Sequence, residues 1–400
     1  MKILVLNAGS SSLKYQLFNM ESGEVLAKGL CERIGTTGAV THKRPGKENY
    51  EKDVPLPNHD TALETILSLL TSEEYGVLSS ISEIDAVGHR VIHGGELVRE
   101  SSLVNDYLMK VLEDLVPLNP LHAPPAIAGI KACLALMPNV PQVGVFDTSF
   151  YSDIEPARYI YPIPYELYEN EQVRRYGFHS TSHRYVSAEM AKILGREDDK
   201  NLKIITCHLG NGSSITAVEG GKAVDTSMGF TPQEGIVMGT RSGSIDPTIV
   251  TYLMRKGYDA DKVEEILNKK SGLLGISGIS DDCRNLTAAA AEGNERAKLA
   301  LDILVNSIKR YIGMYVAEMN GLDALVFTAG IGENQWNIRQ MVCENMEALG
   351  IELDVEKNKN FTRGIPFDIS LDGAKVQTWI IPTDEEYMIA IDTARIVAAK

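Results

Sequence analysis

Two arginines, Arg90 and Arg241, stand in the glycine-containing segments GHRVIHGG and GTRSGS. A guanidinium at such a turn can bind an anion through two parallel N–H groups. The alternative for an isolated arginine is an ion pair on the protein surface, which is the commoner role. Because 39 basic residues face 54 acidic ones, for a net charge of −15, an anionic substrate requires locally concentrated cations. Both arginines are therefore candidates for neutralising a transferred phosphoryl group or a carboxylate.

Two distant segments share a pattern of strand, small-residue turn and strand. In the first, the turn NAGSSS interrupts an apolar run and Lys14 follows it. In the second, residues 204–218, the turn is Gly210-Asn211-Gly212. Backbone N–H groups and hydroxyls at such turns can approach a phosphate closely. Each pattern alone is more typical of an ordinary hairpin, but its recurrence indicates a duplicated domain that holds a nucleotide between its halves.

A histidine pair and a carboxylate complete the candidate chemistry. His179 and His183 have the spacing of half a zinc site, but no HExxH glutamate or third ligand accompanies them. A capped helix with His183 facing solvent is the alternative. Asp147 directly follows the apolar run QVGVF, so its carboxylate is expected at the edge of a sheet. Capping of a turn together with Thr148 is its alternative role.

The elements that must position these residues alternate between strand and helix, which is typical of an α/β fold. Strands are predicted over 3–6, 13–18, 84–88, 142–146, 204–209, 213–218 and 324–328. Helices are predicted over 60–70, 106–115, 125–136, 182–194, 247–256, 261–269 and 294–320. A Pro- and Tyr-rich stretch over 148–168 indicates a domain boundary.

Composition excludes several classes of protein. The five cysteines are far apart, odd in number and without a CxxC pair, which argues against a disulfide framework or a zinc site and favours a reduced cytosol. The acidic balance disfavours nucleic acid and anionic membranes as partners. The first apolar run ends at Asn7, too soon for a signal peptide, and no segment approaches the ~18 apolar residues of a membrane span. A cytoplasmic protein is expected.

Nine blocks of the sequence together resemble the acetate kinase family. They are LVLNAGSSSLKYQLF, GHRVIHGG, FDTSFY, YGFHSTSH, HLGNGSS, GTRSGSIDP, GISGISDDCR, FTAGIGEN and PTDEEYMIA. The blocks span residues 3 to 391 in family order, so the resemblance covers essentially the whole chain.

The resemblance implies the fold of the actin, sugar-kinase and Hsp70-type ATPases. Two lobes are expected, each built on a duplicated ββαβα ribonuclease-H-like core, with the nucleotide in the cleft between them. The N-terminal lobe would cover residues 1–149 and be completed by a C-terminal helix, 383–400. The C-terminal lobe, 150–382, would bind the nucleotide and form the interface of a homodimer.

The resemblance also implies roles for individual residues. Arg90 would bind the carboxylate or acyl phosphate, Arg241 and His179 would stabilise the migrating phosphoryl, and Asp147 would orient the carboxylate or a metal-bound water. The acyl pocket would comprise Ile92, Leu121, Phe178 and Pro232. Mg²⁺, with Mn²⁺ as the alternative metal, would be held by Asn7 and Glu385, with Glu386 an adjacent alternative. The nucleotide contacts would be Lys14, His208, Leu209, Gly210, Asn211, Gly212, Asp282, Cys283, Arg284, Gly330, Ile331, Gly332, Glu333 and Asn334.

Four positions depart from the usual family pattern. Ser180 replaces a glycine and Ser244 an aspartate, beside His179 and Arg241 respectively. Cys283 replaces a phenylalanine, which removes an aromatic surface near the expected adenine and weakens the case for purine preference. Ile92 replaces a valine, which should shrink the acyl pocket and favour acetate over propionate.

The expected activity is reversible transfer of the ATP γ-phosphoryl to acetate, giving acetyl phosphate and ADP. Acetate is already ionised near neutral pH, so no strong base is required. Two arginines flanking His179 suit direct in-line transfer better than a phosphohistidine. The alternatives are a propionate or short-chain acyl kinase and, in another class, a nucleotide-driven switch of the actin or Hsp70 kind. A switch needs a hydrolytic water rather than two arginines beside a carboxylate pocket.

Overall fold

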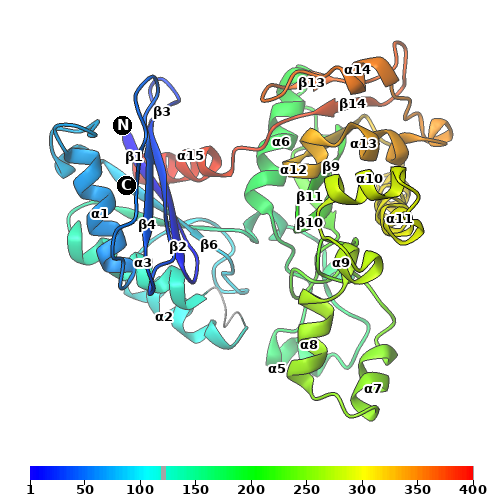
Figure 1. The fold of residues 1–400 in the computed structure, drawn as a ribbon, viewed down its shortest axis with the longest axis horizontal. Helices are drawn as coiled ribbons and strands as arrows, with labels where there is room; N and C mark the ends of the chain where they lie inside the picture. The colour runs from blue at the N-terminus through cyan, green and yellow to red at the C-terminus, as the bar shows by residue number, and fades with distance from the viewer. Residues whose placement is uncertain (119–122, 400) are drawn as a thin grey trace. The chain divides into compact units, whose positions relative to one another are not determined.

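The computed structural model describes residues 1–118 and 123–399 and divides into two compact units (Figure 1). The first unit comprises Met1–Ser152 and Asp384–Lys400, and the second comprises Asp153–Thr383. The first boundary follows the short 3-10 turn η3 (Ser149–Tyr151), whose Tyr151 is 2% exposed. Ser152 remains tied to the first unit because its hydroxyl donates to the backbone oxygen of Arg99 at 2.5 Å.

The first unit is built on an eight-stranded sheet in the order β5-β4-β3-β2-β1-β6-β8-β7. Its strands are β1 (Lys2–Ala8), β2 (Ser12–Asn19), β3 (Glu24–Glu32), β4 (Ala39–Lys43), β5 (Tyr50–Lys52), β6 (Ala86–Val91), β7 (Ser102–Leu103) and β8 (Gln142–Phe146). Strands β1, β2 and β3 pair antiparallel, whereas β1, β6 and β8 run parallel. The first predicted hairpin, β1–β2, is confirmed.

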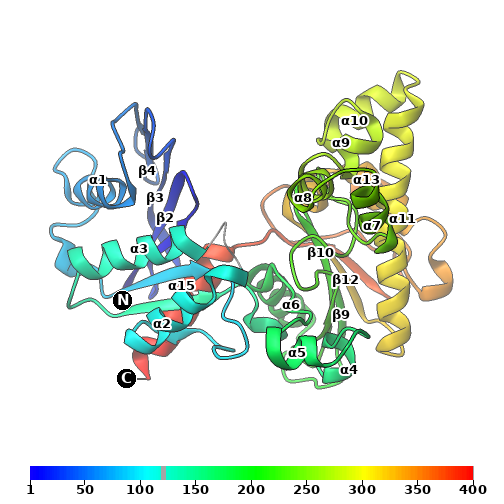
Figure 2. The same cartoon turned by 90° about the horizontal axis from the view of Figure 1, so that it is seen from below.

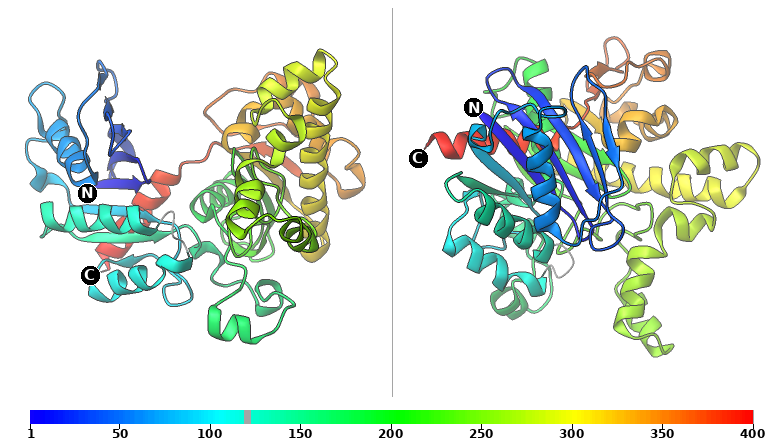
Figure 3. Two further views of the ribbon diagram at one scale, coloured as in Figure 1. Left: turned by 60° about the horizontal axis from the view of Figure 1, so that its bottom comes forward. Right: turned by 60° about the vertical axis from the view of Figure 1, so that its left-hand side comes forward.

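Alternation along β1 assigns each side chain to one of two cores, because successive residues of a strand point to opposite faces. Leu4 and Leu6 pack in the core formed with α1 (His59–Thr71) and α3 (Ala123–Leu136). Ile3 and Val5 pack on the opposite face in the core formed with α15 (Glu385–Ala398). The last helix of the chain, α15, is therefore part of the first unit. Figure 3 shows α1 lying against the strands of the same unit.

The second unit is built on a six-stranded sheet in the order β11-β10-β9-β12-β14-β13. Its strands are β9 (Lys203–Leu209), β10 (Ser213–Glu219), β11 (Lys222–Thr226), β12 (Ala324–Thr328), β13 (Phe367–Asp368) and β14 (Gln377–Ile380). Strands β9, β10 and β11 pair antiparallel and β9, β12 and β14 run parallel, as do their counterparts in the first sheet. The two sheets thus share one order of core strands, and the expected duplication of a two-lobe α/β fold is confirmed.

Strand β9 has one apolar and one polar face. Ile205, Cys207 and Leu209 pack in a core with the long helix α11 (Glu295–Glu318). Thr206 and His208, on the opposite face, hydrogen-bond to side chains of α6 (Ser180–Ile193). Figure 2 shows the sheet lying between α6 and α11. This polar face is unusual for a buried strand and marks the region where the candidate site lies.

The remaining elements connect these layers. They are η1 (Ile81–Glu83), α2 (Asp106–Asp114), η2 (Val116–Leu118), α4 (Pro156–Tyr159), α5 (Glu166–Glu171), α7 (Thr248–Arg255), α8 (Ala260–Lys269), α9 (Gly272–Ser277), α10 (Cys283–Ala291), α12 (Ala329–Asn334), α13 (Trp336–Cys343), η4 (Glu347–Leu349) and α14 (Val355–Lys359).

Local chemistry explains where the helix predictions succeed and where they differ. The predicted helix 294–320 is α11, whose first turn is capped because the Asn294 Oδ1 accepts from the N–H of Ala297 at 3.0 Å. The predicted helix 60–70 begins earlier, since its cap is Asn58 rather than Asp60. The expected nucleotide-binding loop at 282–284 is wrong as a loop: Asp282 caps α10, which begins at Cys283. Helices α9 and α13 and strands β13 and β14 were not predicted.

Candidate active site

In the first unit, a buried ion pair joins the ends of two parallel strands. Arg90 lies on β6, and Asp147 directly follows the neighbouring strand β8. The Arg90 Nη2 donates to the Asp147 Oδ2 at 2.9 Å, and Asp147 is 2% exposed. The Arg90 Nε lies 4.0 Å from the Glu385 Oε2 at the start of α15. Two parallel strands and helix α15 thus bring together three charged residues that are far apart in the sequence.

The carboxylates set the charge state of this group. Burial alone would lower the pKa of Arg90, but Asp147, Glu385 and Glu386 raise it above its ordinary value. Burial raises the pKa of Glu385, and the nearby carboxylates of Asp147 and Glu386 raise it further against the opposing effect of Arg90. The guanidinium therefore remains a half-buried cation that is held in a fixed orientation by Asp147.

Asn7, Lys14 and Glu385 lie in the same region of the first unit. Asn7 and Lys14 are cross-strand partners on β1 and β2. The ammonium of Lys14 forms an ion pair with Glu386, the residue next to Glu385. Asn7 and Glu385 offer an amide and a carboxylate oxygen, the donor types that Mg²⁺ takes from proteins. The donor set fits such a metal, although the described residues contain no group of three or more His, Cys, Asp or Glu side chains that could hold one.

A small apolar recess lies next to Arg90. It has a volume of about 10 Å³, close to the minimum that holds one water molecule. Its lining residues are Val91, Ile92, His93, Leu112, Leu115, Ala123, Ala126 and Ile127. Of the expected acyl pocket, Ile92 lines this recess, Leu121 lies outside the described residues, and Phe178 and Pro232 belong to the second unit.

In the second unit, Arg241 and His179 converge on the turn between β9 and β10. A Cβ atom built on Gly212 would lie 3.4 Å from the Arg241 Nη1 and 3.6 Å from the His179 Nε2. The same Nη1 donates to the backbone oxygen of Pro232 at 2.9 Å, which fixes the guanidinium. Burial lowers the pKa of Arg241 from its ordinary value. The absence of a side chain at Gly212 thus leaves a space between a cation and an imidazole.

His179 is held by a left-handed backbone conformation and by a shared hydroxyl. Its φ of 58° is uncommon for a residue with a side chain and is worth a functional explanation. The His179 Nδ1 is 2.8 Å from the Ser214 Oγ, and the His183 Nε2 is 2.7 Å from the same oxygen. The His183 Nδ1 is in turn 2.6 Å from the Thr206 Oγ1. His183 is 0% exposed, so the solvent-facing alternative for it is wrong.

A second hydroxyl chain holds His208. The His208 Nδ1 is 2.7 Å from the Ser182 Oγ, which accepts from the Thr383 hydroxyl at 2.8 Å. The rings of His208 and His179 are stacked, with centroids 4.2 Å apart and an interplanar angle of 22°. Two imidazoles at the edge of the Gly210–Gly212 turn are therefore each fixed through their Nδ1 atoms.

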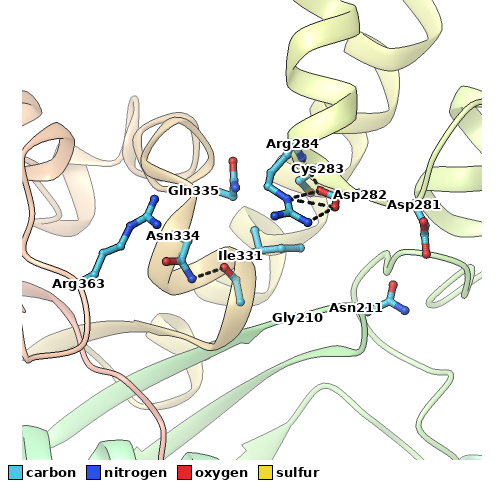
Figure 4. Close-up of a pocket in the computed structure, with 11 residues that line it drawn as sticks. Gly210, Asn211, Asp281, Asp282, Cys283, Arg284, Ile331, Asn334, Gln335 and Arg363 are labelled. Carbon is cyan, nitrogen blue, oxygen red and sulfur yellow. Dashed lines mark hydrogen bonds and ion pairs between the residues drawn. The ribbon is translucent and has the colours of Figure 1, made fainter. Parts of the chain in front are cut away.

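A cavity of about 540 Å³ lies beside this turn, within the second unit (Figure 4). Its volume is in the range of small-molecule sites. Eight of the expected nucleotide contacts line it: Gly210, Asn211, Asp282, Cys283, Arg284, Gly330, Ile331 and Asn334. Asp281, Gln335 and Arg363 also line it and were not predicted. Asp281 lies within the block GISGISDDCR and Gln335 directly follows FTAGIGEN, whereas Arg363 has no motif around it that could have indicated its position.

Two lining residues differ from what their sequence context suggests. Asp282 pairs with Arg284, whose Nη2 donates to the Asp282 Oδ2 at 2.6 Å, as Figure 4 shows. Cys283 is 2% exposed and packs in the hydrophobic core, so this position offers little surface to a base. The Arg363 side chain reaches the same cavity from a different segment of the chain.

The other expected nucleotide contacts do not line this cavity. Lys14 belongs to the first unit, and Leu209 is 1% exposed in the core. The Glu333 Oε1 accepts from the backbone N–H groups of Ala329 at 2.9 Å and Thr383 at 3.2 Å, so this carboxylate stabilises the protein backbone. The remaining residues of this set are His208, Gly212 and Gly332; Gly212 belongs to the turn described above, and the His208 ring lies at its edge.

A buried arginine that was not predicted supports the floor of the cavity. Arg339 is 0% exposed and donates to the backbone oxygens of Gly332 at 2.8 Å and Glu333 at 3.0 Å. Its Nε donates to the Oδ1 of Asn358 at 2.8 Å. Asn358 lies close to Arg363 in the sequence. Arg339 thereby ties α12 to the segment that supplies Arg363. Burial lowers the pKa of Arg339 to about 10.

No helix among residues 1–118 and 123–399 is long and apolar enough to cross a membrane.

Comparison with known proteins identifies the family. A sequence model of the acetokinase family matches residues 2–391. Acetate kinase 2 of Clostridium perfringens is 53% identical over the full length of both chains, and the acetate kinase of Caldanaerobacter subterraneus is 56% identical over 99% of each. Among crystal structures, the acetate kinase of Porphyromonas gingivalis superposes with a TM-score of 0.94 at 47% identity, and a propionate kinase of Francisella tularensis with 0.90 at 40%, each over 99% of both chains. The chain therefore belongs to the acetokinase family.

Proposed function

We propose that this protein catalyses the reversible transfer of the γ-phosphoryl group of ATP to acetate, giving acetyl phosphate and ADP. Full-length identity of 53% or more to acetate kinases supports the activity. The observation that carries the proposal is the space at Gly212, which Arg241 and His179 border within 4 Å beside a cavity of nucleotide size.

The second unit would stabilise the migrating phosphoryl group. Phosphoryl transfer depends mainly on positioning and on neutralising the charge of the transferred group. Arg241 supplies a fixed positive charge, and His179 supplies a hydrogen bond from the other side of the same space. Since both groups bind the transferred oxygens directly, transfer from ATP to acetate in one in-line step requires no covalent enzyme intermediate. The cavity residues, including Asn211, Ile331 and Asn334, would hold the nucleotide.

The first unit would bind the acyl substrate and the metal. Arg90 binds the carboxylate, and Asp147 keeps the guanidinium in place through its 2.9 Å hydrogen bond. The recess lined by Ile92 accepts the methyl group. Asn7 and Glu385 would hold Mg²⁺, or Mn²⁺, which neutralises phosphate charge when it is bound. The proposed acyl-binding lobe is the first unit, Met1–Ser152 with Asp384–Lys400, and the proposed nucleotide-binding lobe is the second unit, Asp153–Thr383.

Hydroxamate formation tests the activity. Acetate, propionate and butyrate are each incubated with Mg-ATP and hydroxylamine, which traps the acyl phosphate. Acetate is expected to react fastest, and Arg241→Ala to lose most of the rate, whereas exposed Arg255→Ala does not. Hydrolysis of ATP without hydroxamate from any carboxylate would instead indicate the nucleotide-driven switch.

A test of Arg90 requires a variant that also removes the charge of its partner, Asp147. Arg90→Ala alone would remove the cation that pairs with the buried Asp147 carboxylate, which typically costs about 3–5 kcal/mol of stability. The double variant Arg90→Gln with Asp147→Asn removes both charges and keeps the side-chain shapes similar. It should remain folded by circular dichroism and show a much higher KM for acetate. An unchanged KM would contradict the assignment of Arg90.

A short-chain acyl kinase with a preference for propionate is the second candidate. The 40% identity to a protein described as a propionate kinase favours it. The recess of about 10 Å³ favours acetate, because it leaves little room for a further methylene group. A higher kcat/KM for propionate than for acetate would decide for this alternative.

The proposal includes a homodimer, formed through the second unit, in the cytoplasm. Exposed apolar side chains on α7 of that unit support a protein interface: Ile249, Tyr252 and Met254 are 43%, 56% and 47% exposed. All five cysteines are buried and unpaired, which agrees with a reducing compartment. Sedimentation of the wild type and of an Ile249→Asp, Tyr252→Asp variant tests the interface; a wild-type monomer would refute it.

A further inference from the structure

His179 and Arg241 reach the space at Gly212 from two different segments of the second unit. His179 directly follows residues 174–178 and precedes the first residue of α6. Arg241 donates to the backbone oxygen of Pro232, which lies within residues 226–235. The rate of a reaction between positioned groups depends on their spacing to within about 1 Å. What joins the two segments therefore decides how well the two groups are placed.

The guanidinium of Arg175 joins these segments. Its Nη1 donates to the backbone oxygen of Thr226 at 2.8 Å and, at longer distances, to those of Met228 at 3.2 Å and Ser227 at 3.3 Å. Its Nη2 donates to the Glu234 Oε1 at 2.9 Å. A guanidinium can hold several acceptors at once because its N–H groups are fixed in one plane. One side chain thus binds both ends of the loop that carries Pro232.

The other carboxylate oxygen of Glu234 is held by Tyr161. The Tyr161 hydroxyl donates to the Glu234 Oε2 and accepts from the backbone N–H of Phe230 at 2.9 Å. A Cβ atom built on Gly229 would lie 1.7 Å from the same Oε2 and 2.1 Å from the Tyr161 hydroxyl oxygen. Only glycine therefore fits at this position, and the contact between Tyr161 and Glu234 occupies the room of a side chain.

Backbone hydrogen bonds continue the connection toward His179. The backbone oxygen of Gly229 accepts from the N–H groups of Tyr176 at 3.0 Å and Gly177 at 3.3 Å. His179, two residues further along, has the left-handed φ of 58°. A residue with a side chain keeps such a conformation only where the surrounding structure holds it. The bonds to Gly229 fix the chain immediately before that residue.

The hydrogen bonds of Arg175 and Glu234 join ionised groups. Burial alone would lower the pKa of Arg175, but Glu234 and Asp225 raise it above its ordinary value. The Arg175 side chain is 16% exposed, and its Nε lies 3.9 Å from the Asp225 Oδ1. Hydrogen bonds between ionised partners are shorter and stronger than those between neutral ones. Arg175 is therefore a permanently charged, tightly bound link between the two segments.

Residues 226–235 are in turn bound to the segment that carries Arg241. The backbone oxygen of Pro232 accepts from the Arg241 Nη1 at 2.9 Å. The Gln233 Nε2 donates to the hydroxyl of Ser242, the next residue after Arg241, at 2.6 Å. Hydrogen bonds thus run without a break from the residues before His179, through Arg175 and Glu234, to the guanidinium of Arg241.

We infer that Arg175, held by Glu234 and Tyr161, is a positioning residue that sets the distance between His179 and Arg241 across the space at Gly212. None of the three side chains lines the nucleotide cavity, so they act through the groups that they hold. The inference rests on the proposed phosphoryl transfer, to which it adds residues outside the expected catalytic set. Groups fixed in advance need no rearrangement at the moment of reaction, which is the basis of their catalytic effect.

Hydrogen exchange tests the connection independently of activity. Exchange of backbone hydrogens is followed by mass spectrometry in peptides that cover residues 174–178 and 226–235. Arg175→Met removes every donor of the guanidinium, so exchange should become faster in both segments together, while peptides from α11 remain unchanged. Unchanged exchange in both segments, or faster exchange in only one of them, would overturn the inference.

Kinetics of the same variant test the consequence. Arg175→Met should lower kcat by about 10- to 100-fold, because a misplacement of roughly 1 Å costs about 100-fold in rate. The KM values for ATP and acetate should change little, since the nucleotide cavity and Arg90 keep their own residues. Wild-type kcat in a folded Arg175→Met protein would refute the positioning role.

Two variants of Glu234 separate hydrogen bonding from bulk. Glu234→Leu can bind neither Arg175 nor Tyr161 and should lower kcat as Arg175→Met does. Glu234→Gln should restore kcat, because its amide oxygen can accept from Arg175 and its NH₂ group can donate to the Tyr161 oxygen. Equal kcat values for the two variants would contradict the inference.

The matched control is another arginine of the second unit, Arg196. It forms ion pairs with Asp199 at 2.7 Å and Asp323 at 3.3 Å, beside the first residue of β9 and thus at the opposite end of that strand from the Gly210–Gly212 turn. Arg196→Met should leave kcat and the exchange of residues 174–178 and 226–235 unchanged. Loss of kcat in this control equal to that in Arg175→Met would show a general effect of destabilisation and refute the specific role of Arg175.

Two further results keep the inference separable from the proposed function. If Arg175→Met does not fold, Arg175→Lys keeps the positive charge beside Glu234 but cannot donate to the same four acceptors, and it carries the same expectations. If both segments exchange faster in the variant but the wild type phosphorylates no carboxylate, the link through Arg175 stands and the proposed activity fails.

Discussion

Replacing Gly212 by alanine should lower kcat by about 100-fold without unfolding the protein. The backbone of Gly212 does not have the positive φ that penalises a side chain, and the nearest atoms to an added Cβ are the Arg241 Nη1 at 3.4 Å and the His179 Nε2 at 3.6 Å. These are ordinary van der Waals contacts. Alanine should therefore fold at this position, and its methyl group would occupy the space in which we propose the phosphoryl group binds.

The distances give the size of the effect. An oxygen that accepts hydrogen bonds from both groups would lie about 2.7–3.1 Å from each donor. A methyl carbon 3.4 Å and 3.6 Å from the same two atoms fills nearly the same position, so the phosphoryl group must move by roughly 1 Å. A displacement of that size typically costs about 100-fold in rate, equivalent to about 2.7 kcal/mol of transition-state stabilisation.

The assay measures kcat and KM for ATP and acetate alongside the urea midpoint of unfolding. The control is Gly313→Ala on α11, where an added Cβ meets no atom within 4 Å. That substitution should raise stability by about 0.5–1 kcal/mol and leave kcat unchanged. A folded Gly212→Ala protein with wild-type kcat would refute the placement of the phosphoryl group between Arg241 and His179.

Three further predictions concern selectivity, pH and the support of the cavity. Ile92→Ala should raise the propionate-to-acetate ratio of kcat/KM by about tenfold, because one methylene is worth roughly 1–3 kcal/mol in such a pocket. The control is the exposed Ile163→Ala, which should leave this ratio unchanged. An unchanged ratio in Ile92→Ala would contradict the role of the recess. Burial lowers the pKa of His89 to about 4, so between pH 6.5 and 4 the unfolded chain binds more protons and stability must fall as the pH falls, by at most roughly 3 kcal/mol. Urea unfolding of His89→Gln should show a shallower pH dependence than the wild type, and equal slopes would be inconsistent with a buried neutral His89. Arg339→Met removes the donor to the backbone oxygens of Gly332 and Glu333. The substitution should lower the free energy of unfolding, measured in urea, by about 2–4 kcal/mol and raise the KM for ATP. A fully stable variant with a normal KM would show that Arg339 does not support the cavity.

The sequence alone was sufficient to predict the elements that depend on patterns of neighbouring residues. The hairpins at Asn7–Ser12 and Gly210–Gly212, the strand before Asp147 and the long helix ending near Gly321 all depend on small-residue turns or on apolar periodicity. Such patterns act over a few residues, so they can be recognised without knowledge of the rest of the chain. The same motifs, strung together over the whole length, were also enough to indicate the family.

Side-chain partners across the fold could not be predicted in that way. Lys14 pairs with Glu386, and the Glu333 carboxylate binds backbone N–H groups, although both residues stand in motifs that suggest nucleotide contacts. Arg363 reaches the cavity without any motif around it. The positions of these side chains depend on contacts between segments that are distant in the sequence. Local sequence patterns carry no information about such contacts.

The clearest division between sequence and tertiary structure lies at the histidines. The spacing of His179 and His183 left a zinc ligand, a helix cap and a solvent-exposed position open. Only the packing of α6 on the polar face of β9 buries His183 and brings it within hydrogen-bond distance of Ser214 and Thr206. Residue types and spacing thus determined which chemistry was available, whereas the fold determined which nitrogen atom faces the reaction, because a hydrogen bond needs its two partners at one distance and in one direction.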